Sequence, residues 1–288
     1  MLRKFIAGVS GFLYLVGSRN CEALRLNLGG VRRSLAALCA GLCLIAAGAL
    51  PVSAQDATWL TTPGSGDFNT DANWNPANTP GSGDTAFFGG SNTTSLTFSA
   101  FTTIGGWTFN AGAADYDFFT NGVVLTFDGT GIVINGGSAT ITNNTVLEFD
   151  NSSTAGSATI TNNSSLRFHD TSTAGSAAIT NNFALTFFTT STAGNAAITN
   201  NGNLTFGDSS TAGSAAITNN STITFGNSST ADSATIINTH NLFFNDTSTA
   251  GSATITNEFF LNFSTTMNSM GSPFTRRTSR RRPAWCGR

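Results

Sequence analysis

The amino-acid sequence predicts an all-β protein whose body is a parallel β-solenoid (β-helix) with 19-residue rungs, a rung being one full turn of the coil. Three observations predict this fold. Several residue types recur every 19 positions with no insertion or deletion. Within each unit, apolar and polar residues alternate over three to five positions, which is typical of short, half-buried strands. Thr, Ser, Asn and Gly dominate and nothing recurs at 3.6 residues, so the repeats are not helical.

Residues 1–54 are expected to be a Sec-type export signal with an extended N-terminal region. An apolar run, residues 34–50, follows Arg32 and Arg33, and the small residues that come next fit cleavage after Ala54. The run is shorter than the roughly 20 residues that a spanning helix needs. We therefore expect a cleaved signal, and no stable transmembrane span in the mature chain.

Two further features concern this leader. A second apolar stretch at residues 5–17 leaves open whether the true start lies downstream of Met1. Three of the four cysteines also fall in the leader, which leaves Cys286 alone in the mature chain. A single cysteine can form neither a disulfide nor a cysteine metal site within one chain. A cysteine-free body suits a protein that crosses an oxidising periplasm unfolded.

The formal net charge of -2 hides a segregation of charge along the chain. Residues 55–275 hold fourteen acids and one base, Arg167, so this body carries 1 - 14 = -13. An acidic body repels phosphate backbones, which argues against nucleic acid as a partner. Such a surface favours solubility outside the cell.

Residues 55–136 are expected to form an irregular N-terminal cap with imperfect rungs. The segment holds Pro-Gly-Ser-Gly-Asp twice, at 63–67 and 80–84, together with three of the four tryptophans. These are Trp59, Trp74 and Trp107. Bulky aromatic residues can cover the open edge of a first rung, and the alternative is an exposed tryptophan platform for sugars.

Residues 137–263 form the regular repeat. The inward columns are Ala139, Ala158, Ala177, Ala196, Ala215, Ala234 and Ala253; Ile141, Ile160, Ile179, Ile198, Ile217, Ile236 and Ile255; Leu147, Leu166, Leu185, Leu204, Ile223, Leu242 and Leu261; and Phe149, Phe168, Phe187, Phe206, Phe225, Phe244 and Phe263. Asn pairs at the same step, such as Asn162–Asn163, predict a ladder of amides at one corner, and we interpret them as turn residues. The segments that join the two strands of each unit have turn-like composition.

Residues 264–288 depart from the repeat in composition and register, and end in a run rich in arginine. We expect a basic tail that is disordered or derived from a frameshift. The functional alternative is a basic anchor for anionic lipid or polysaccharide.

An export signal, the opening from Trp59 to Phe88, and tandem units of the type Ser-Thr-Ala-Gly-Ser-Ala-Thr-Ile-Thr-Asn-Asn resemble the passenger region of bacterial autotransporters over about residues 35–263. The resemblance implies a β-helix in the periplasm, at the cell surface or outside a Gram-negative bacterium, with a structural or adhesive role. Host or environmental glycans or proteins, or a separate translocator barrel, are the implied partners. The chain departs from the family because nothing after residue 263 supplies a translocator barrel, so a truncated gene product without independent function is the first alternative.

Catalysis is the second alternative, since enzymes that cleave polysaccharides also use β-helices. His169 and His240 fall at different positions of the unit and are interpreted as turn residues. Asp170, Asp208 and Asp246 share one position on alternate rungs, about 10 Å apart, too far for two of them to hold one metal ion directly. We therefore predict no catalytic residue, no metal site and no cofactor.

Overall fold

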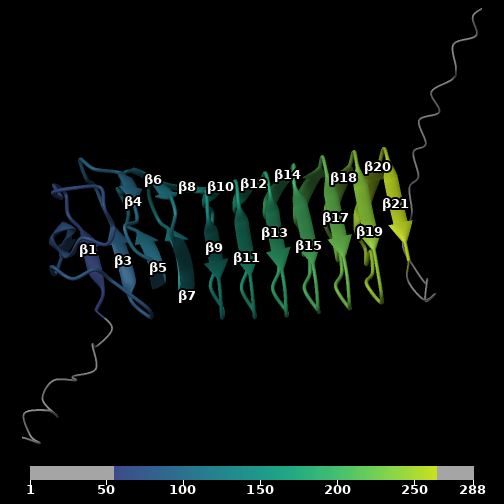
Figure 1. Cartoon of the computed structure of the whole chain (residues 1–288), viewed down its shortest axis with the longest axis horizontal. Coiled ribbons are helices and arrows are strands. Elements are labelled where there is room, and N and C mark those ends of the chain that lie inside the picture. Colours follow the sequence, from purple (N-terminus) through teal and green to yellow (C-terminus); the bar gives the residue numbers. More distant parts are fainter. Residues whose placement is uncertain (1–54, 265–288) are drawn as a thin grey trace, which may run out of the picture. The chain divides into compact units, whose positions relative to one another are not determined.

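The computed structural model describes residues 55–264, and these residues form a parallel β-solenoid, as predicted. From β4 onward, successive strands add alternately to a 9-stranded sheet and a 12-stranded sheet, and β1, β2 and β3 all belong to the 12-stranded sheet. Figure 1 shows the strands of the regular rungs following one another in sequence order. The leader and the basic tail lie outside the described residues.

The 12-stranded sheet, here called sheet A, is dominated by the odd-numbered strands. In sheet order its strands are β2 (Trp74–Asn75), β1 (Ala57–Trp59), β3 (Thr85–Phe88), β5 (Thr102–Phe109), β7 (Val124–Ile134), β9 (Val146–Phe149), β11 (Ser165–Phe168), β13 (Ala184–Phe187), β15 (Asn203–Phe206), β17 (Thr222–Phe225), β19 (Asn241–Phe244) and β21 (Phe260–Phe263).

The 9-stranded sheet, sheet B, consists of even-numbered strands. They are β4 (Ser95–Thr97), β6 (Asp115–Thr120), β8 (Ser138–Asn143), β10 (Thr159–Asn162), β12 (Ala178–Asn181), β14 (Ala197–Asn200), β16 (Ala216–Asn219), β18 (Thr235–Asn238) and β20 (Thr254–Asn257). The described residues contain one short 3-10 helix, η1 (Asp71–Asn73). None of their helices is long and apolar enough to span a membrane.

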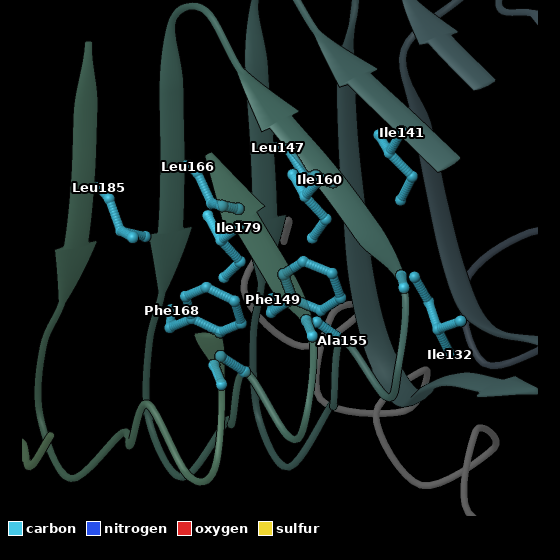
Figure 2. Packing of buried hydrophobic residues seen from close by; sticks show 14 of the residues in the cluster. Ile132, Ile141, Leu147, Phe149, Ala155, Ile160, Leu166, Phe168, Ile179 and Leu185 are labelled. Atoms are coloured by element: carbon cyan, nitrogen blue, oxygen red, sulfur yellow. The ribbon is translucent and has the colours of Figure 1, made fainter. Parts of the chain in front are cut away.

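The pairing between neighbouring rungs keeps a step of 19 residues. Ile160 pairs with Ile141 on one side and with Ile179 on the other. The predicted isoleucine, leucine and phenylalanine columns all line up in this way. Figure 2 shows part of them, such as Ile160, Leu166 and Phe168, packed in the interior. The phenylalanine column is a continuous stack, in which the rings of Phe168 and Phe187 lie 4.8 Å apart with an interplanar angle of 6°. Fully burying such a side chain contributes about 1.5–3 kcal/mol.

The segment that leads from each strand of sheet A to the next strand of sheet B, such as residues 169–177, forms a third side of the coil. The interpretation of this segment as a turn did not predict it. Thr173 makes parallel bridges to Thr154 and Thr192, and the same column continues to Thr249. The residues on either side of it, Ser172 and Ala174, are buried. The alternation of inward and outward side chains therefore continues on this side, although only one residue of each rung pairs here.

Two corners of each rung require a backbone with positive φ. Glycine occupies the first corner in the regular rungs, as at Gly175 (φ +62°), and Asp232 (φ +50°) is the exception. The second corner is occupied by Asn, Asp or Thr, as at Asp170 (φ +55°) and Thr189 (φ +61°). Asn and Asp tolerate this conformation better than other non-glycine residues, which explains their recurrence there.

The Asn pairs form two ladders. The first Asn of each pair is buried, and Asn162 Nδ2 donates to Asn181 Oδ1 of the next rung at 2.7 Å. The second Asn is exposed, and Asn163 Nδ2 donates to Asn144 Oδ1 of the preceding rung at 2.9 Å. The predicted ladder is confirmed, but half of it lies inside the protein, where each amide is fixed by hydrogen bonds.

The first rungs are less regular. Leu125 pairs with Leu147, 22 positions on, and the pairing of β5 with β7 shifts register between Ile104 and Gly106. At this end of sheet A, β2 pairs with β1 in the antiparallel direction. Here the interior is filled by aromatic rings, as where Trp107 stacks on Phe118 at 4.1 Å.

Candidate functional site

The outer surface of the regular rungs consists mainly of Thr, Ser, Asn and Ala side chains, with a few exposed apolar residues such as Phe183 and Ile237. Because apolar residues and the buried Asn ladder fill the interior, a ligand of these rungs would contact the outer columns. On sheet B the outward positions are mainly Thr and Ala, as at Thr180 and Ala178 of β12. On sheet A the outward column runs through Thr186, Thr205 and Thr224. The threonines of the sheet A column follow one another at about the 4.8 Å spacing of neighbouring strands. Beyond them, the column continues to Arg167 and Glu148 at one end and to Phe243 at the other.

The third side presents two parallel columns of hydroxyl-bearing side chains. One column is Thr154, Thr173, Thr192, Thr211, Thr230 and Thr249, and the other is Ser152, Thr171, Thr190, Ser209, Ser228 and Thr247. In the first column the hydroxyl accepts a hydrogen bond from the glycine amide two residues on, as from Gly175 N to Thr173 Oγ1 at 3.0 Å. In the second, Thr190 Oγ1 donates to the carbonyl of Asp170 at 2.9 Å. These bonds fix the orientation of the hydroxyls before any ligand binds.

The aspartates that share one column are corner residues. Asp170 Oδ2 accepts a hydrogen bond from the backbone amide of Asn151 at 3.0 Å, and Asp208 Oδ2 accepts one from the amide of Thr189 at the same distance. Each carboxylate thus binds the backbone of the preceding rung. This arrangement gives the repeated aspartates a structural role.

The two histidines lie in different columns, as the sequence spacing predicted. His169 stacks with Phe188 of the next rung at 5.9 Å, and His240 stacks with Phe259 at 5.2 Å. The structure does not bring the two imidazoles together. Within residues 55–264, no group of three or more His, Cys, Asp or Glu side chains could hold a metal ion.

The tryptophans of the first rungs do not form a sugar platform. Trp59, Trp74 and Trp107 are each at most 2% exposed. Trp74 Nε1 donates to the carbonyl of Phe68 at 2.7 Å, and the rings of Trp59 and Trp74 meet edge to face at 5.0 Å. The alternative of an exposed tryptophan surface is therefore wrong, because these rings fill the interior at the first end of the coil.

Charged side chains gather at the first regular rungs. Arg167 forms an ion pair with Glu148, with 2.9 Å between Nη1 and Oε1. Burial raises the pKa of the nearby Asp150 carboxyl, and the negative charge of Glu148 raises it further. Two neighbouring carboxyls, one of them with a raised pKa, are a feature that glycoside-cleaving sites also use. The sequence analysis did not single out this group. Glu148 and Asp150 lie two residues apart on one rung, and Arg167 reaches Glu148 through the pairing of β9 with β11.

The two Pro-Gly-Ser-Gly-Asp motifs end in aspartates with different environments. Partial burial acts to raise the pKa of Asp67, but hydrogen bonds from Thr70, Ser99 and Asn69 outweigh it and hold the pKa below its ordinary value. Asp84 is buried, and its Oδ2 accepts a hydrogen bond from the amide of Gly81 at 2.6 Å. Both aspartates therefore fix loops of the first rungs.

Comparison with known proteins finds no family model, no curated protein and no solved structure that matches the chain.

Proposed function

We propose that the protein is an exported, autotransporter-type passenger with a structural or adhesive role. The observation that carries this proposal is the pair of hydroxyl-bearing columns on the third side, which recur over six successive rungs.

The repeated surface suits a repetitive ligand. The ladders of main-chain bonds and the buried amides hold the columns in fixed positions, so little conformational entropy is lost on binding. A polymer that contacts several rungs at once gains effective concentration with each contact, even when one contact is weak. Hydroxyl and amide groups form hydrogen bonds with sugars or with peptide backbones. Glycans and extended protein segments are therefore the ligand classes that we propose.

Binding is tested by placing lysines on one face at a time. A variant with Thr173→Lys, Thr192→Lys and Thr211→Lys changes the third side. A matched control carries Thr161→Lys, Thr180→Lys and Thr199→Lys on the outer face of sheet B. On glycan and matrix-protein arrays, we expect the wild type and the control to bind a common ligand and the third-side variant to lose it at least tenfold. Equal binding by both variants, or no binding by the wild type, would contradict the proposal.

Export is a separate part of the proposal and rests on the leader and on the cysteine-free body. Protease treatment of intact cells that express the gene should degrade the protein if it is displayed, whereas a cytoplasmic marker should survive. A chain in which residues 34–50 carry three leucine-to-aspartate changes should stay inside. Sequencing the gene beyond codon 288 for a shifted translocator tests the alternative of a truncated gene product.

A carbohydrate-active enzyme is the second candidate function, and the charged group around Asp150 favours it. Incubating the protein with pectin-like and neutral polysaccharides and measuring reducing ends tests this candidate. If the wild type is active, and the activity is lost in Asp150→Asn and Glu148→Gln but retained in Asp117→Asn, the protein has a catalytic role and the proposed adhesive role is wrong.

A further inference from the structure

The third side differs from the other two outer faces because its two columns keep the same chemistry on every regular rung. One column is threonine on six successive rungs, from Thr154 to Thr249, and the other is serine or threonine on the same six. The outward column of sheet A instead passes into Arg167 and Phe243, and a column of sheet B passes into Ile237. Within the described rungs, the third side is therefore the face with unbroken hydroxyl columns.

This face is also close to flat along the axis of the solenoid. The centroids of successive phenylalanine rings from Phe149 to Phe244 lie 4.7–4.9 Å apart, and the ring planes tilt by only 5–6° from one rung to the next. Neighbouring strands of an ordinary sheet rotate by roughly 20–25°. A small rotation per rung keeps side chains that are several rungs apart in nearly one plane.

The two columns thus form a nearly rectangular grid. Thr171 and Thr173 are two residues apart in an extended segment, which places their side chains about 6.6 Å apart across the face. Thr173 and Thr192 follow one another along the axis at the rung spacing. The prism faces of hexagonal ice repeat their water molecules on a rectangular grid whose short and long repeats are close to these two spacings.

Main-chain hydrogen bonds fix the grid. Thr173 N donates to the carbonyl of Ser153 at 2.9 Å, and Ala174 N donates to the carbonyl of Thr192 at 3.0 Å. The bond from Gly175 N uses one acceptor position of Thr173 Oγ1 and leaves its O–H free to donate. An array that is ordered in advance loses little conformational entropy when an ordered surface binds it.

The two columns contain no charged side chain, although aspartates lie at the corners that border them. Ammonium and carboxylate groups hold hydration shells that do not fit the ice lattice, whereas a threonine offers a hydroxyl that can replace a lattice water and a methyl that can lie between such waters. The closest approach of a corner carboxylate to the columns is 3.5 Å, between Asp232 Oδ2 and Thr211 Oγ1.

We propose that the third side binds the prism face of ice crystals through its two hydroxyl columns. The hydroxyls take part in the lattice of the outermost water layer, and six rungs add contacts that are individually weak. This activity goes beyond the adhesive role, and it requires neither export nor a glycan or protein ligand.

The test measures how much of the purified full chain enters ice that grows slowly from a dilute solution, with serum albumin as a protein that growing ice excludes. Thr192→Lys places a long cation in the middle of one hydroxyl column. Thr180→Lys is the matched control, because it makes the same change at an equally half-buried outward threonine of sheet B. We expect the wild type to be enriched in the ice at least fivefold over albumin, Thr192→Lys to lose at least fivefold of this enrichment, and Thr180→Lys to keep it.

Melting curves from circular dichroism separate loss of ice binding from loss of the fold. If Thr192→Lys melts early, Thr190→Lys at the exposed neighbouring column should give the same loss of enrichment in a folded protein. Exclusion of the wild type from ice, or equal enrichment of the third-side and sheet B variants, would overturn the proposal. A wild type that ice excludes but that binds an array ligand through the third side would overturn ice binding alone. Ice binding without any array ligand would instead overturn the adhesive role.

Discussion

The buried side-chain amide of Asn181 donates to Asn200 Oδ1 at 2.7 Å and to the carbonyl oxygen of Asn203 at 3.0 Å. One NH2 group therefore joins two strands of the next rung at the corner where the chain passes from sheet B to sheet A. The same pair of bonds recurs along the ladder, which makes the internal asparagine a structural element of the interior.

We expect Asn200→Asp to destabilise the protein by about 3–5 kcal/mol at neutral pH, because a buried carboxylate in the ladder has no positive partner. The substitution also removes the side-chain NH2 group of Asn200, which donates to Asn219 Oδ1 and to the carbonyl oxygen of Thr222. Asn201→Asp, on the exposed ladder one residue on, should cost less than about 1 kcal/mol. Urea unfolding of the two variants measures the difference, and similar unfolding midpoints would contradict the roles given to the two ladders.

The inward and outward assignment of the columns can be tested in the same middle rungs. Ile198 is 2% exposed, whereas Thr205 points outward on sheet A. Ile198→Asp should unfold the array, because it removes a buried apolar side chain and introduces an unpaired charge. Thr205→Asp should change the melting temperature by only a few degrees. Circular dichroism on heating checks both, and equal melting curves would count against the assignment.

The sequence was sufficient to predict the coil, its 19-residue step and the identity of the core, because in-register stacking places every residue of a column in the same environment. Ile160 and Phe168 could be assigned to the interior from alternation alone. The third side was missed, because Thr173 is the one residue of its segment in each rung that pairs, and the flanking Ser and Ala residues have turn-like composition.

The environment of individual polar groups was predicted less well. The burial of Asn162 was missed, because Asn is common in turns and only the structure shows that its amide lies inside and is bonded. The raised pKa of Asp150 comes first from burial and then from Glu148, two residues before it, and no motif in the sequence indicates that burial. In the first rungs the step varies, so the positions of Trp74 and Trp107 could not be derived from the period.

The phenylalanine stack should contribute through packing as well as burial. Phe206 is fully buried, with ring centroids 4.8 Å from Phe187 and 4.7 Å from Phe225. Phe206→Ala should lower the free energy of unfolding by about 3–5 kcal/mol, because the rungs above and below prevent the cavity from collapsing. Phe183→Ala, at a ring that is 62% exposed, should cost less than about 0.5 kcal/mol. A cost above 2 kcal/mol for the exposed ring would contradict this reading of the core.

One substitution should stabilise the protein. Thr189 has a φ of +61°, a conformation that is unfavourable for a β-branched residue, and the same corner is occupied by Asn151 and Asn227 on other rungs. Thr189→Asn should raise the free energy of unfolding by about 1 kcal/mol. Thr190→Asn, at the next residue, should not raise it, because it removes the bond to the carbonyl of Asp170. Thermal unfolding in parallel tests the pair, and a lower melting temperature for Thr189→Asn would contradict the assigned strain.

The acid sensitivity of the first rungs should depend on Asp67. Hydrogen bonds hold the pKa of its carboxyl below the ordinary value of 3.8, so the folded state favours the ionised form. The carboxylate therefore stabilises the fold fully at pH values above the pKa of Asp67 in the unfolded chain. This stabilisation is lost as the pH falls through the lower pKa of Asp67 in the folded protein. Asp67→Asn should therefore cost about 1 kcal/mol at pH 7 and less at pH 3, where the wild type has lost part of the contribution. Unfolding by urea between pH 2.5 and 7 measures this convergence, with the exposed Asp117→Asn as the control. A penalty for Asp67→Asn that stays constant over this range would show that the carboxylate charge does not stabilise the loop.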